Sequence, residues 1–229
     1  MTVQEALNAR RGAVGMVIFD CDGVLVDSEP LANRVCAACI TAAGWPMSGH
    51  ECEQRFVGLN LEAMVPVIEA NLGRTLPPDW VQNLTTTLVE VLGRESTPIP
   101  GAIAAVHGVS ALGLPWRVAS NSSHPEMNAK FACLGLTSLV SGRLHSYTDV
   151  AHGKPAPDLF LAAAAAQAMP PARCIVIEDS VTGARAAAAA GMFCLGYAPH
   201  DDGARLRAEG AHPFHDMAVL PALLAEAMQ

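Results

Sequence analysis

The sequence has few cations and no long apolar run. Lysine and arginine together number 14 of 229 residues, against 22 aspartates and glutamates, and the formal net charge is −8. An acidic chain without a basic cluster argues against a nucleic-acid partner, because affinity for nucleic acid comes mainly from neutralising phosphates. No stretch approaches the ~18 consecutive apolar residues that can span a bilayer, so no membrane partner is expected.

A secretion signal and a disulfide framework are also lacking. The residues before Val14 have no apolar core of the kind that signal peptides carry, and their role stays open. Seven cysteines form an odd set without framework spacing. Cys36 and Cys39 match the C-x-x-C pattern of metal and redox sites, but no second pair exists and an alanine-rich helical pattern surrounds them, so we interpret them as small buried side chains. A reduced, cytoplasmic protein is the simplest expectation.

The composition provides enough apolar surface for a large core. It is 51% hydrophobic with a mean hydropathy of +0.29, which suits one full domain and a smaller one. The apolar run Met16–Phe19 is typical of a strand buried on both faces of a parallel sheet. Asp20, Asp22 and Gly23 follow it directly, where open α/β sheets bind ligands. Two acids so close repel, and a divalent cation such as Mg²⁺ would compensate them; an ordinary Asp-Gly turn is the alternative.

Residues 30–94 have a purely helical pattern. Pro30 suits the first turn of one helix, and Ser48 with Glu51 forms a capping box that opens a second. Asn60 and Asp79 can cap a third and a fourth helix. Glycines 44, 58, 73 and 93 are the predicted helix ends. The pattern predicts a small helical cap domain over 30–94, inserted into a core formed by 1–29 and 95–229.

Beyond the turn-rich link 97–101, strands and helices alternate. This order predicts an α/β fold with a doubly wound parallel sheet. The strands are expected at 116–120, 174–177 and 193–195, and the helices at 102–112, 125–134, 158–168, 181–190 and from about 217 onward.

Polar side chains follow several of these segments. Asp20 and Asp22 end the first strand, Ser120-Asn121-Ser122 ends the second, and Glu178-Asp179 follows a later one, while a loop supplies Lys154. Because carboxyl ends of parallel strands share one edge, these groups should meet in a single crevice. Acids, a hydroxyl and one cation would form a site for a metal ion and a phosphoryl group.

The order of these pieces resembles the haloacid dehalogenase superfamily. The segment 20–28 (DCDGVLVDS) is similar to its first motif, 118–122 (VASNS) to its second, 153–158 (GKPAPD) to its third and 177–183 (IEDSVTG) to its fourth. The helical insert resembles the family's cap of the first type. The likeness extends over nearly the whole chain, and it points to the phosphoglycolate phosphatase and β-phosphoglucomutase-like branch with a Rossmann-like core.

The resemblance implies Mg²⁺-dependent chemistry on a small phosphorylated metabolite. Asp20 would be the nucleophile that forms an aspartyl-phosphate, and Asp22 the general acid and base. The metal would be held by Asp20, the backbone carbonyl of Asp22 and Asp179, with Glu178 nearby.

The phosphate ligands implied by the family are Ser120, the Asn121 amide and Lys154. Lys154 has support of its own, because the chain has only two lysines, Lys130 and Lys154, beside twelve arginines. A compact ammonium fits between a carboxylate and a phosphate where a planar guanidinium would not. Chance retention on a surface loop is the alternative.

Within the family, Asp22 favours phosphate esters over dehalogenation. Mutase-like members carry a threonine and a histidine after the first motif, where this chain has Ser28 and Ala32. They also carry an arginine where this chain has Leu61. These departures remove groups for a second phosphate, so we favour hydrolysis of a sugar phosphate or phosphorylated sugar acid. A β-phosphoglucomutase-like phosphomutase is the alternative.

The cap is expected to close over the site, with hinges at 27–30 and 97–101. Arg55, Asn60 and His124 are candidate contacts for the non-phosphate end of the substrate, although His124 is equally explained as an exposed loop residue. A monomer is expected.

Two other classes share part of this chemistry. Receiver domains combine acids, a hydroxyl, a lysine and Mg²⁺, but they are shorter and lack a cap insert. A non-catalytic metal-binding or phosphorylatable module would leave the complete set of four motifs unexplained.

Overall fold

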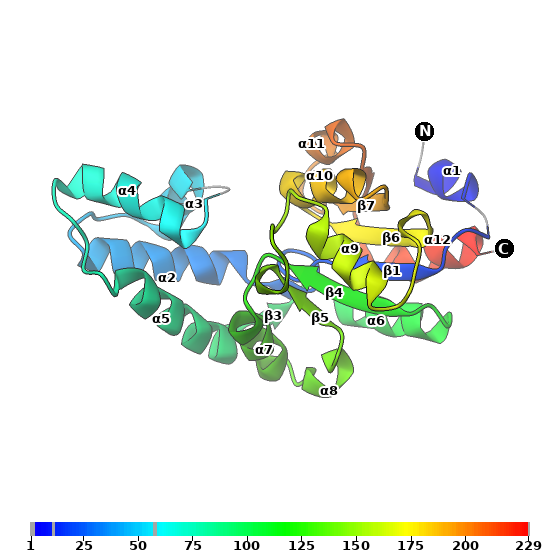
Figure 1. Ribbon diagram of the computed structural model, residues 1–229, viewed down its shortest axis with the longest axis horizontal. Coiled ribbons are helices and arrows are strands. Elements are labelled where there is room, and N and C mark those ends of the chain that lie inside the picture. Colours follow the sequence, from blue (N-terminus) through cyan, green and yellow to red (C-terminus); the bar gives the residue numbers. More distant parts are fainter. Residues whose placement is uncertain (1–2, 11, 57–58, 229) are drawn as a thin grey trace.

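The molecule has two parts, an α/β core that carries both termini and a smaller helical cap (Figure 1). The computed structural model describes residues 3–10, 12–56 and 59–228. The helical part follows the first core strand in the chain.

The core contains a six-stranded sheet in the order β5-β4-β1-β6-β7-β8, and all of its neighbouring strands are parallel. The strands are β1 (Met16–Phe19), β4 (Trp116–Ser120), β5 (Leu144–Ser146), β6 (Cys174–Glu178), β7 (Phe193–Tyr197) and β8 (His212–Phe214). The predicted doubly wound parallel sheet is confirmed. Its first strand is central, because β1 pairs with β4 on one side and β6 on the other.

The register of these three strands places their polar ends together. Phe19 lies opposite both Val118 and Ile177. The backbone N–H of Asp20 donates to the Ile177 carbonyl over 2.9 Å, which extends the pairing by one residue. Asp20 therefore leaves the sheet beside the end of β6, where Glu178 and Asp179 follow.

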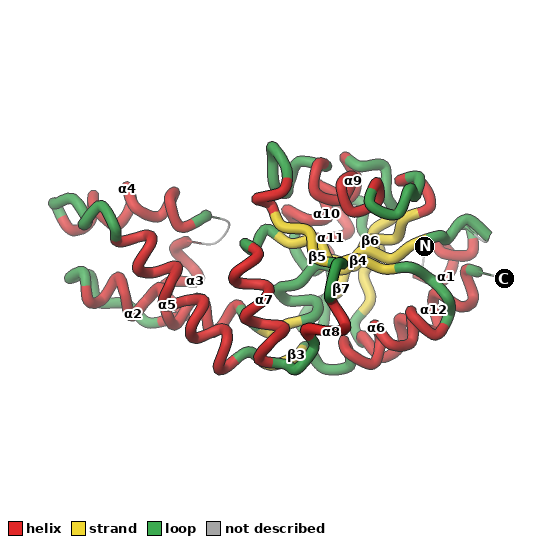
Figure 2. The backbone as a smooth tube through the Cα atoms, turned by 60° about the horizontal axis from the view of Figure 1, so that its bottom comes forward, coloured by secondary structure: helices red, strands yellow, loops and turns green. Residues whose placement is uncertain are grey.

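Helices cover both faces of the sheet, and each face has its own apolar cluster (Figure 2). One face is covered by α1 (Val3–Asn8), α6 (Ala102–Ala111), α7 (His124–Cys133), α8 (Thr137–Val140) and α12 (Leu220–Ala227), and the other by α9 (Asp158–Ala165), α10 (Val181–Ala189) and α11 (Ala204–Ala208). Short 3₁₀ turns occupy Tyr147–Asp149, Pro171–Arg173 and Met217–Val219. None of the helices in the described ranges is long and apolar enough to cross a membrane.

The cap is a helical unit with a separate apolar cluster. Its helices are α2 (Glu29–Ala42), α3 (Gly49–Phe56), α4 (Leu61–Leu72) and α5 (Trp80–Glu95). Ile40, Ile68 and Leu84 are among its fully buried side chains. Two short antiparallel strands, β2 (Val26–Asp27) and β3 (Thr97–Pro98), connect the cap to the core. They overlap the segments 27–30 and 97–101, which stay the predicted hinges.

Most predicted caps are present. Ser48 and Glu51 form the reciprocal capping box of α3, and the Asn60 side chain accepts from the Ala63 N–H over 2.8 Å at the start of α4. Asp79 is the residue before α5, as predicted, but its side chain makes no capping hydrogen bond, because its carboxylate accepts from the Asn83 side chain instead of a backbone N–H. The predicted end at Gly58 lies outside the described residues.

Several boundaries differ from the predictions. Helix α5 continues through Gly93 and ends at Glu95. Gly93 faces α7, where an added Cβ would lie 3.7 Å from the Ala129 Cβ, an ordinary contact distance. The strands β5 and β8 have three residues each and lack a long apolar run, so the pattern gave no strand there. The N-terminal segment forms α1, whose Ala6 and Leu7 are buried in the core.

Candidate active site

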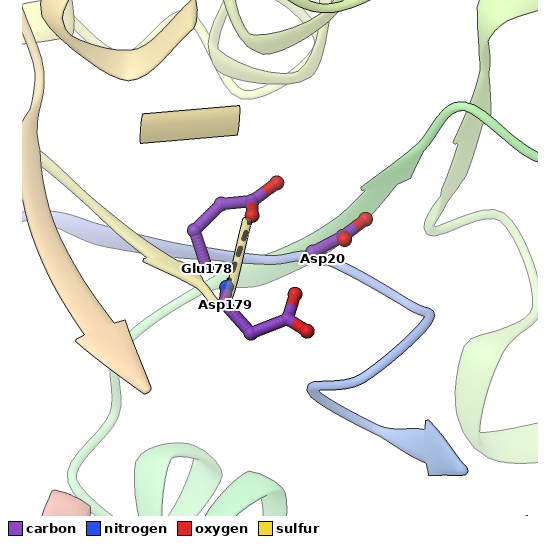
Figure 3. A group of neighbouring side chains, drawn as sticks. All are labelled: Asp20, Glu178 and Asp179. Atoms are coloured by element: carbon purple, nitrogen blue, oxygen red, sulfur yellow. Dashed lines mark hydrogen bonds between the residues drawn. The ribbon is translucent and has the colours of Figure 1, made fainter. Parts of the chain in front are cut away.

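Three carboxylates meet at the carboxyl ends of β1 and β6 (Figure 3). Asp20, Glu178 and Asp179 each contribute an oxygen that lies within 4.8 Å of the other two. Asp20 and Glu178 are buried, and Asp179 is partly exposed. Asp20 lies 158 positions before Glu178 in the sequence, and the parallel sheet brings it beside Glu178 and Asp179.

The electrostatics of this cluster favour a bound cation. Burial raises the pKa of Asp20 to about 7, against the opposing effect of Lys154. Burial, followed by repulsion from Glu178 and Asp20, raises the pKa of Asp179 to about 9. Close carboxylate oxygens with this residual repulsion form a donor set that suits a hard divalent ion. The residues therefore fit the Mg²⁺ expected from the sequence.

Lys154 neutralises part of the cluster. Its Nζ lies 2.8 Å from Asp20 Oδ1 and 2.7 Å from Glu178 Oε1, and its side chain is buried. The ammonium also lies 4.8 Å from the centre of the Phe160 ring. Although burial would lower the pKa of Lys154, the Asp20 and Glu178 carboxylates raise it above the ordinary value.

The loop that carries Lys154 is held by Asn121. The Lys154 N–H donates to Asn121 Oδ1 over 2.9 Å, and Asn121 Nδ2 donates to the Lys154 carbonyl over 3.0 Å. A Cβ added at Gly153 would come within 2.7 Å of the same Oδ1. The Asn121 side chain is thus engaged in fixing the lysine, and its backbone amide remains as the group predicted to face a phosphate.

Two glycines give the acids room. A Cβ at Gly23 would overlap the Asp179 carboxylate, and a Cβ at Gly183 would overlap the Glu178 carboxylate. Gly23 also has φ +72°, a conformation that side chains disfavour. The other oxygen of Glu178 accepts from the N–H groups of Asp179 and Ser180, which orients the loop after β6.

Asp22 points into a separate group of donors. Ser28, Ser120 and Ser122 donate their hydroxyls to its carboxylate, the last two over 3.1 and 2.8 Å. Lys130 Nζ lies 2.5 Å from Asp22 Oδ1. Although burial alone would raise it, Lys130 and the hydroxyls of Ser28 and Ser122 lower the pKa of Asp22 to about 2.

Lys130 was missed by the sequence reasoning, which took only Lys154 as functional. A signal was present, because Lys130 falls beside Met127 and Phe131 on the apolar face of the predicted helix 125–134. A cation among buried positions needs a partner. The sequence alone does not identify Asp22 as that partner, because the two residues lie 108 positions apart.

Comparison with known proteins agrees with this geometry. The family model of haloacid dehalogenase-like hydrolases matches residues 14–191. The chain belongs to this family. Among curated relatives, a 6-phosphogluconate phosphatase of Escherichia coli is 30% identical over 190 residues, covering 81% of this chain and 84% of that protein. A fructose-1-phosphate phosphatase of the same organism is 27% identical over 184 residues, covering 77% and 92%.

Among solved structures, a haloacid dehalogenase family hydrolase from Deinococcus radiodurans with bound phosphate and sodium has a TM-score of 0.77 and 33% identity. The match covers 94% of this chain and 97% of that one. The expected enzyme class is confirmed: this haloacid dehalogenase-like hydrolase is a phosphoric monoester hydrolase.

A cavity of about 490 Å³ lies between the cap and the core of the hydrolase. Lys154 and Asn121 line it from the core, and Asn60 lines it from the cap. The other two predicted substrate contacts lie elsewhere. The Arg55 guanidinium stacks over the Trp45 ring at 5.3 Å, and His124 pairs with Asp149 at 2.8 Å beside a smaller cavity formed by α7, α8 and β5.

Proposed function

We propose that the chain hydrolyses a small sugar phosphate through an aspartyl-phosphate on Asp20. The observation that carries this proposal is the position of the Asp20 carboxylate. It lies 2.8 Å from Lys154 Nζ and beside Asp179, and Lys154 is one of the residues that line the cavity between the cap and the core. A nucleophilic carboxylate must approach an anionic phosphate, so it needs positive charge nearby. Lys154 supplies one such charge, and a metal ion at Asp179 would supply another.

The reaction has two displacements. A carboxylate oxygen of Asp20 attacks phosphorus, the bond from phosphorus to the substrate oxygen breaks, and Asp22 gives the leaving alcohol a proton. The negative charge of the bound phosphate would raise the pKa of Asp22 above its value of about 2 in the empty site and so allow it to carry that proton. Water then attacks phosphorus while Asp22 takes up its proton, and the bond to Asp20 breaks to release inorganic phosphate. Asp20 is regenerated, so the same pair of acids serves both steps.

The remaining residues hold the phosphoryl group and the metal. Ser120 and the Asn121 amide would donate to phosphate oxygens, while Lys154 neutralises charge between the phosphate and Asp20. Asp20, Asp179 and the Asp22 carbonyl would hold Mg²⁺, with Glu178 beside it. When bound, Mg²⁺ supplies electrostatic stabilisation of the transferring group. Ser120 now donates to Asp22, and a phosphate would compete for that hydroxyl.

The cavity lining favours a neutral sugar over a sugar acid. Among the described residues that line it, Lys154 is the one cation, and it is already paired with two carboxylates. Two acidic residues, Glu62 and Glu126, lie on the same lining, and Glu126 caps α7 through Ser123. A carboxylate at the far end of the substrate would find no obvious counter-charge there. The relatives include examples of both substrate types: one is a fructose-1-phosphate phosphatase, with a neutral sugar, and one is a 6-phosphogluconate phosphatase, with a sugar acid.

Hydrolysis is favoured over the phosphomutase alternative by the cap side of the cavity. Ala32 lines it at the position where mutase-like members carry a histidine. An alanine offers neither a base nor a phosphate ligand. Incubation with β-glucose 1-phosphate and a bisphosphate activator tests this choice, because a mutase forms glucose 6-phosphate whereas a phosphatase releases phosphate.

The test of the proposed function is phosphate release from 4-nitrophenyl phosphate with and without Mg²⁺. We expect Mg²⁺-dependent release by the wild type and at least about a 10³-fold loss in Asp20→Asn, which removes the nucleophile. Asp79→Asn, an exposed amide substitution in the cap, is the matched control and keeps full activity. Equal activity in Asp20→Asn would contradict the proposal.

A further inference from the structure

Lys130 is a buried cation that the proposed mechanism does not use. Its residue is 2% exposed, although it sits on a helix of the core surface. Its ammonium lies 2.5 Å from Asp22 Oδ1 and 2.8 Å from Ser122 Oγ. Burying an ammonium has a large desolvation cost unless close partners compensate it.

Packing alone does not explain this residue. Met127 and Phe131, which flank Lys130 on the same face of α7, are fully buried apolar side chains. A methionine of similar length would fill the slot of Lys130 without desolvating a charge. The ammonium therefore has a role at the group it reaches, which is the Asp22 carboxylate.

Lys130 completes a set of donors that fixes both oxygens of Asp22. Lys130 and Ser28 contact Oδ1, while Ser120 and Ser122 contact Oδ2. Three hydroxyls can rotate to other acceptors, and Ser120 is the proposed phosphate ligand. Of the four donors, only Lys130 is charged, and because its ammonium is buried, it needs this carboxylate as its counter-ion.

The donors also come from the boundary between core and cap. Ser28 immediately precedes α2, the first cap helix. Lys130 lies on α7, whose neighbouring residue Ala129 packs against Gly93 of the cap helix α5. Asp22 is thus held between the segment where the chain enters the cap and the core helix that supports the cap.

We infer that Lys130 is the positioning residue of Asp22: it holds the acid–base carboxylate where it can serve the leaving oxygen. This role rests on the proposed function. Without the ammonium, Asp22 loses a fixed contact on Oδ1 and turns toward the hydroxyls alone. Asp22 would then be easier to protonate, but its displaced carboxyl group would deliver the proton to the leaving oxygen less effectively, while binding and nucleophilic attack by Asp20 remain.

Two esters of similar shape separate these steps. The phenol released from phenyl phosphate has a pKa of about 10, like tyrosine, and it needs a proton as it leaves. The 4-nitrophenolate leaves without one. The value of kcat/KM covers the steps up to the first irreversible one, so the ratio between the two esters reports leaving-group protonation by Asp22.

The experiment compares wild type, Lys130→Met, Asp22→Asn and the double variant on both esters with Mg²⁺. We expect Lys130→Met to lower kcat/KM about 10- to 100-fold for phenyl phosphate and less than about threefold for 4-nitrophenyl phosphate, within the range known for acid–base catalysis. The double variant should be no worse than Asp22→Asn, because both remove one function. Met127→Leu, a volume-conserving change on the same face, is the control and keeps the ratio.

The outcomes distinguish the two proposals. Equal losses on both esters, an unchanged ratio, or additive losses in the double variant would overturn the role of Lys130 and leave the phosphatase intact. Absence of phosphate release by the wild type would overturn both. If Lys130→Met does not fold, Lys130→Arg decides: a retained ester ratio supports positioning by the cation, and a ratio like that of Asp22→Asn contradicts it.

Discussion

The position of the Glu178 carboxylate depends on a neighbouring residue without a side chain. Gly183 lies in the first turn of α10, and a Cβ there would overlap the Glu178 carboxylate. Glu178 in turn holds Lys154 and the N–H groups after β6. A glycine at position 183 is therefore needed for Glu178, Lys154 and the loop after β6 to keep their observed positions.

Gly183→Ala should destabilise the protein by about 1–3 kcal/mol, the usual cost of overpacking a filled site. Urea unfolding measures it. Gly49→Ala is the matched control, because a Cβ there would meet Arg34 backbone atoms at an ordinary 3.5 Å. We expect no loss for Gly49→Ala, and equal effects of the two substitutions would contradict the explanation.

The raised pKa values of Asp20 and Asp179 predict a pH-dependent effect of Mg²⁺ on stability. A carboxyl whose folded pKa exceeds its unfolded value stabilises the folded state while protonated, and this contribution is lost as the pH rises through the folded pKa. These groups should lower the melting temperature of the metal-free protein between about pH 5 and pH 9, given folded values of about 7 and 9.

Mg²⁺ replaces the lost protons, so it should raise the melting temperature more at pH 9 than at pH 6. At 100-fold excess over the dissociation constant the gain is about 2.7 kcal/mol, or roughly 5–10 °C for a chain of this size. Thermal denaturation at both pH values tests this. Asp179→Asn should reduce the increase in melting temperature that Mg²⁺ causes. An increase that is the same at both pH values and in Asp179→Asn would contradict this explanation.

At the scale of elements, the sequence predicted most strongly where a pattern was long. The run at 16–19 and the strand at 116–120 match β1 and β4, because most residues of these central strands are apolar and buried. The three-residue edge strand β5 contains His145 and β8 contains Pro213, and neither has a pattern that distinguishes it from a loop. The role of Lys130 was also not predicted, because tertiary packing between distant segments determines its partner.

Helix α1 was not predicted, yet it belongs to the core. Leu7 is fully buried in the cluster that includes Leu224 of α12, and Arg10 stacks over the Phe193 ring at 5.0 Å. Leu7→Ala should lower the free energy of unfolding by about 2–5 kcal/mol, as for other buried leucines. The exposed Ala9→Ser is the control with no expected change. Equal urea midpoints for both variants and the wild type would show that α1 does not stabilise the core.

At the scale of the whole molecule, we expect substrate selectivity to depend on the residues that the cap and the core each contribute to the cavity between them. The four motifs indicated the core groups, but the lining depends on the packing of four cap helices, which no local pattern encodes. Arg55 illustrates this, because its guanidinium stacks on Trp45 rather than lining the cavity. Asn60, in contrast, both caps α4 and lines the cavity.

The acidic lining predicts a preference among phosphorylated metabolites. We expect a higher kcat/KM for neutral sugar phosphates, such as fructose 1-phosphate, than for 6-phosphogluconate. Glu62→Gln should narrow this preference about two- to fivefold by removing a like charge near the substrate, an effect of the size seen for exposed charges. Glu90→Gln, on the cap helix α5, is the control. A preference for 6-phosphogluconate in the wild type would contradict the charge argument.

The central claim is that the Asp20 carboxylate accepts the phosphoryl group, and borohydride trapping tests it most directly. Borohydride reduces an acyl phosphate to an alcohol, so phosphorylated Asp20 becomes homoserine, which peptide mass spectrometry locates. In Asp22→Asn, where water activation is impaired, incubation with 4-nitrophenyl phosphate and Mg²⁺ followed by acid quench and reduction should give homoserine at position 20. No conversion at position 20 under turnover, or conversion at another acid, would contradict the account.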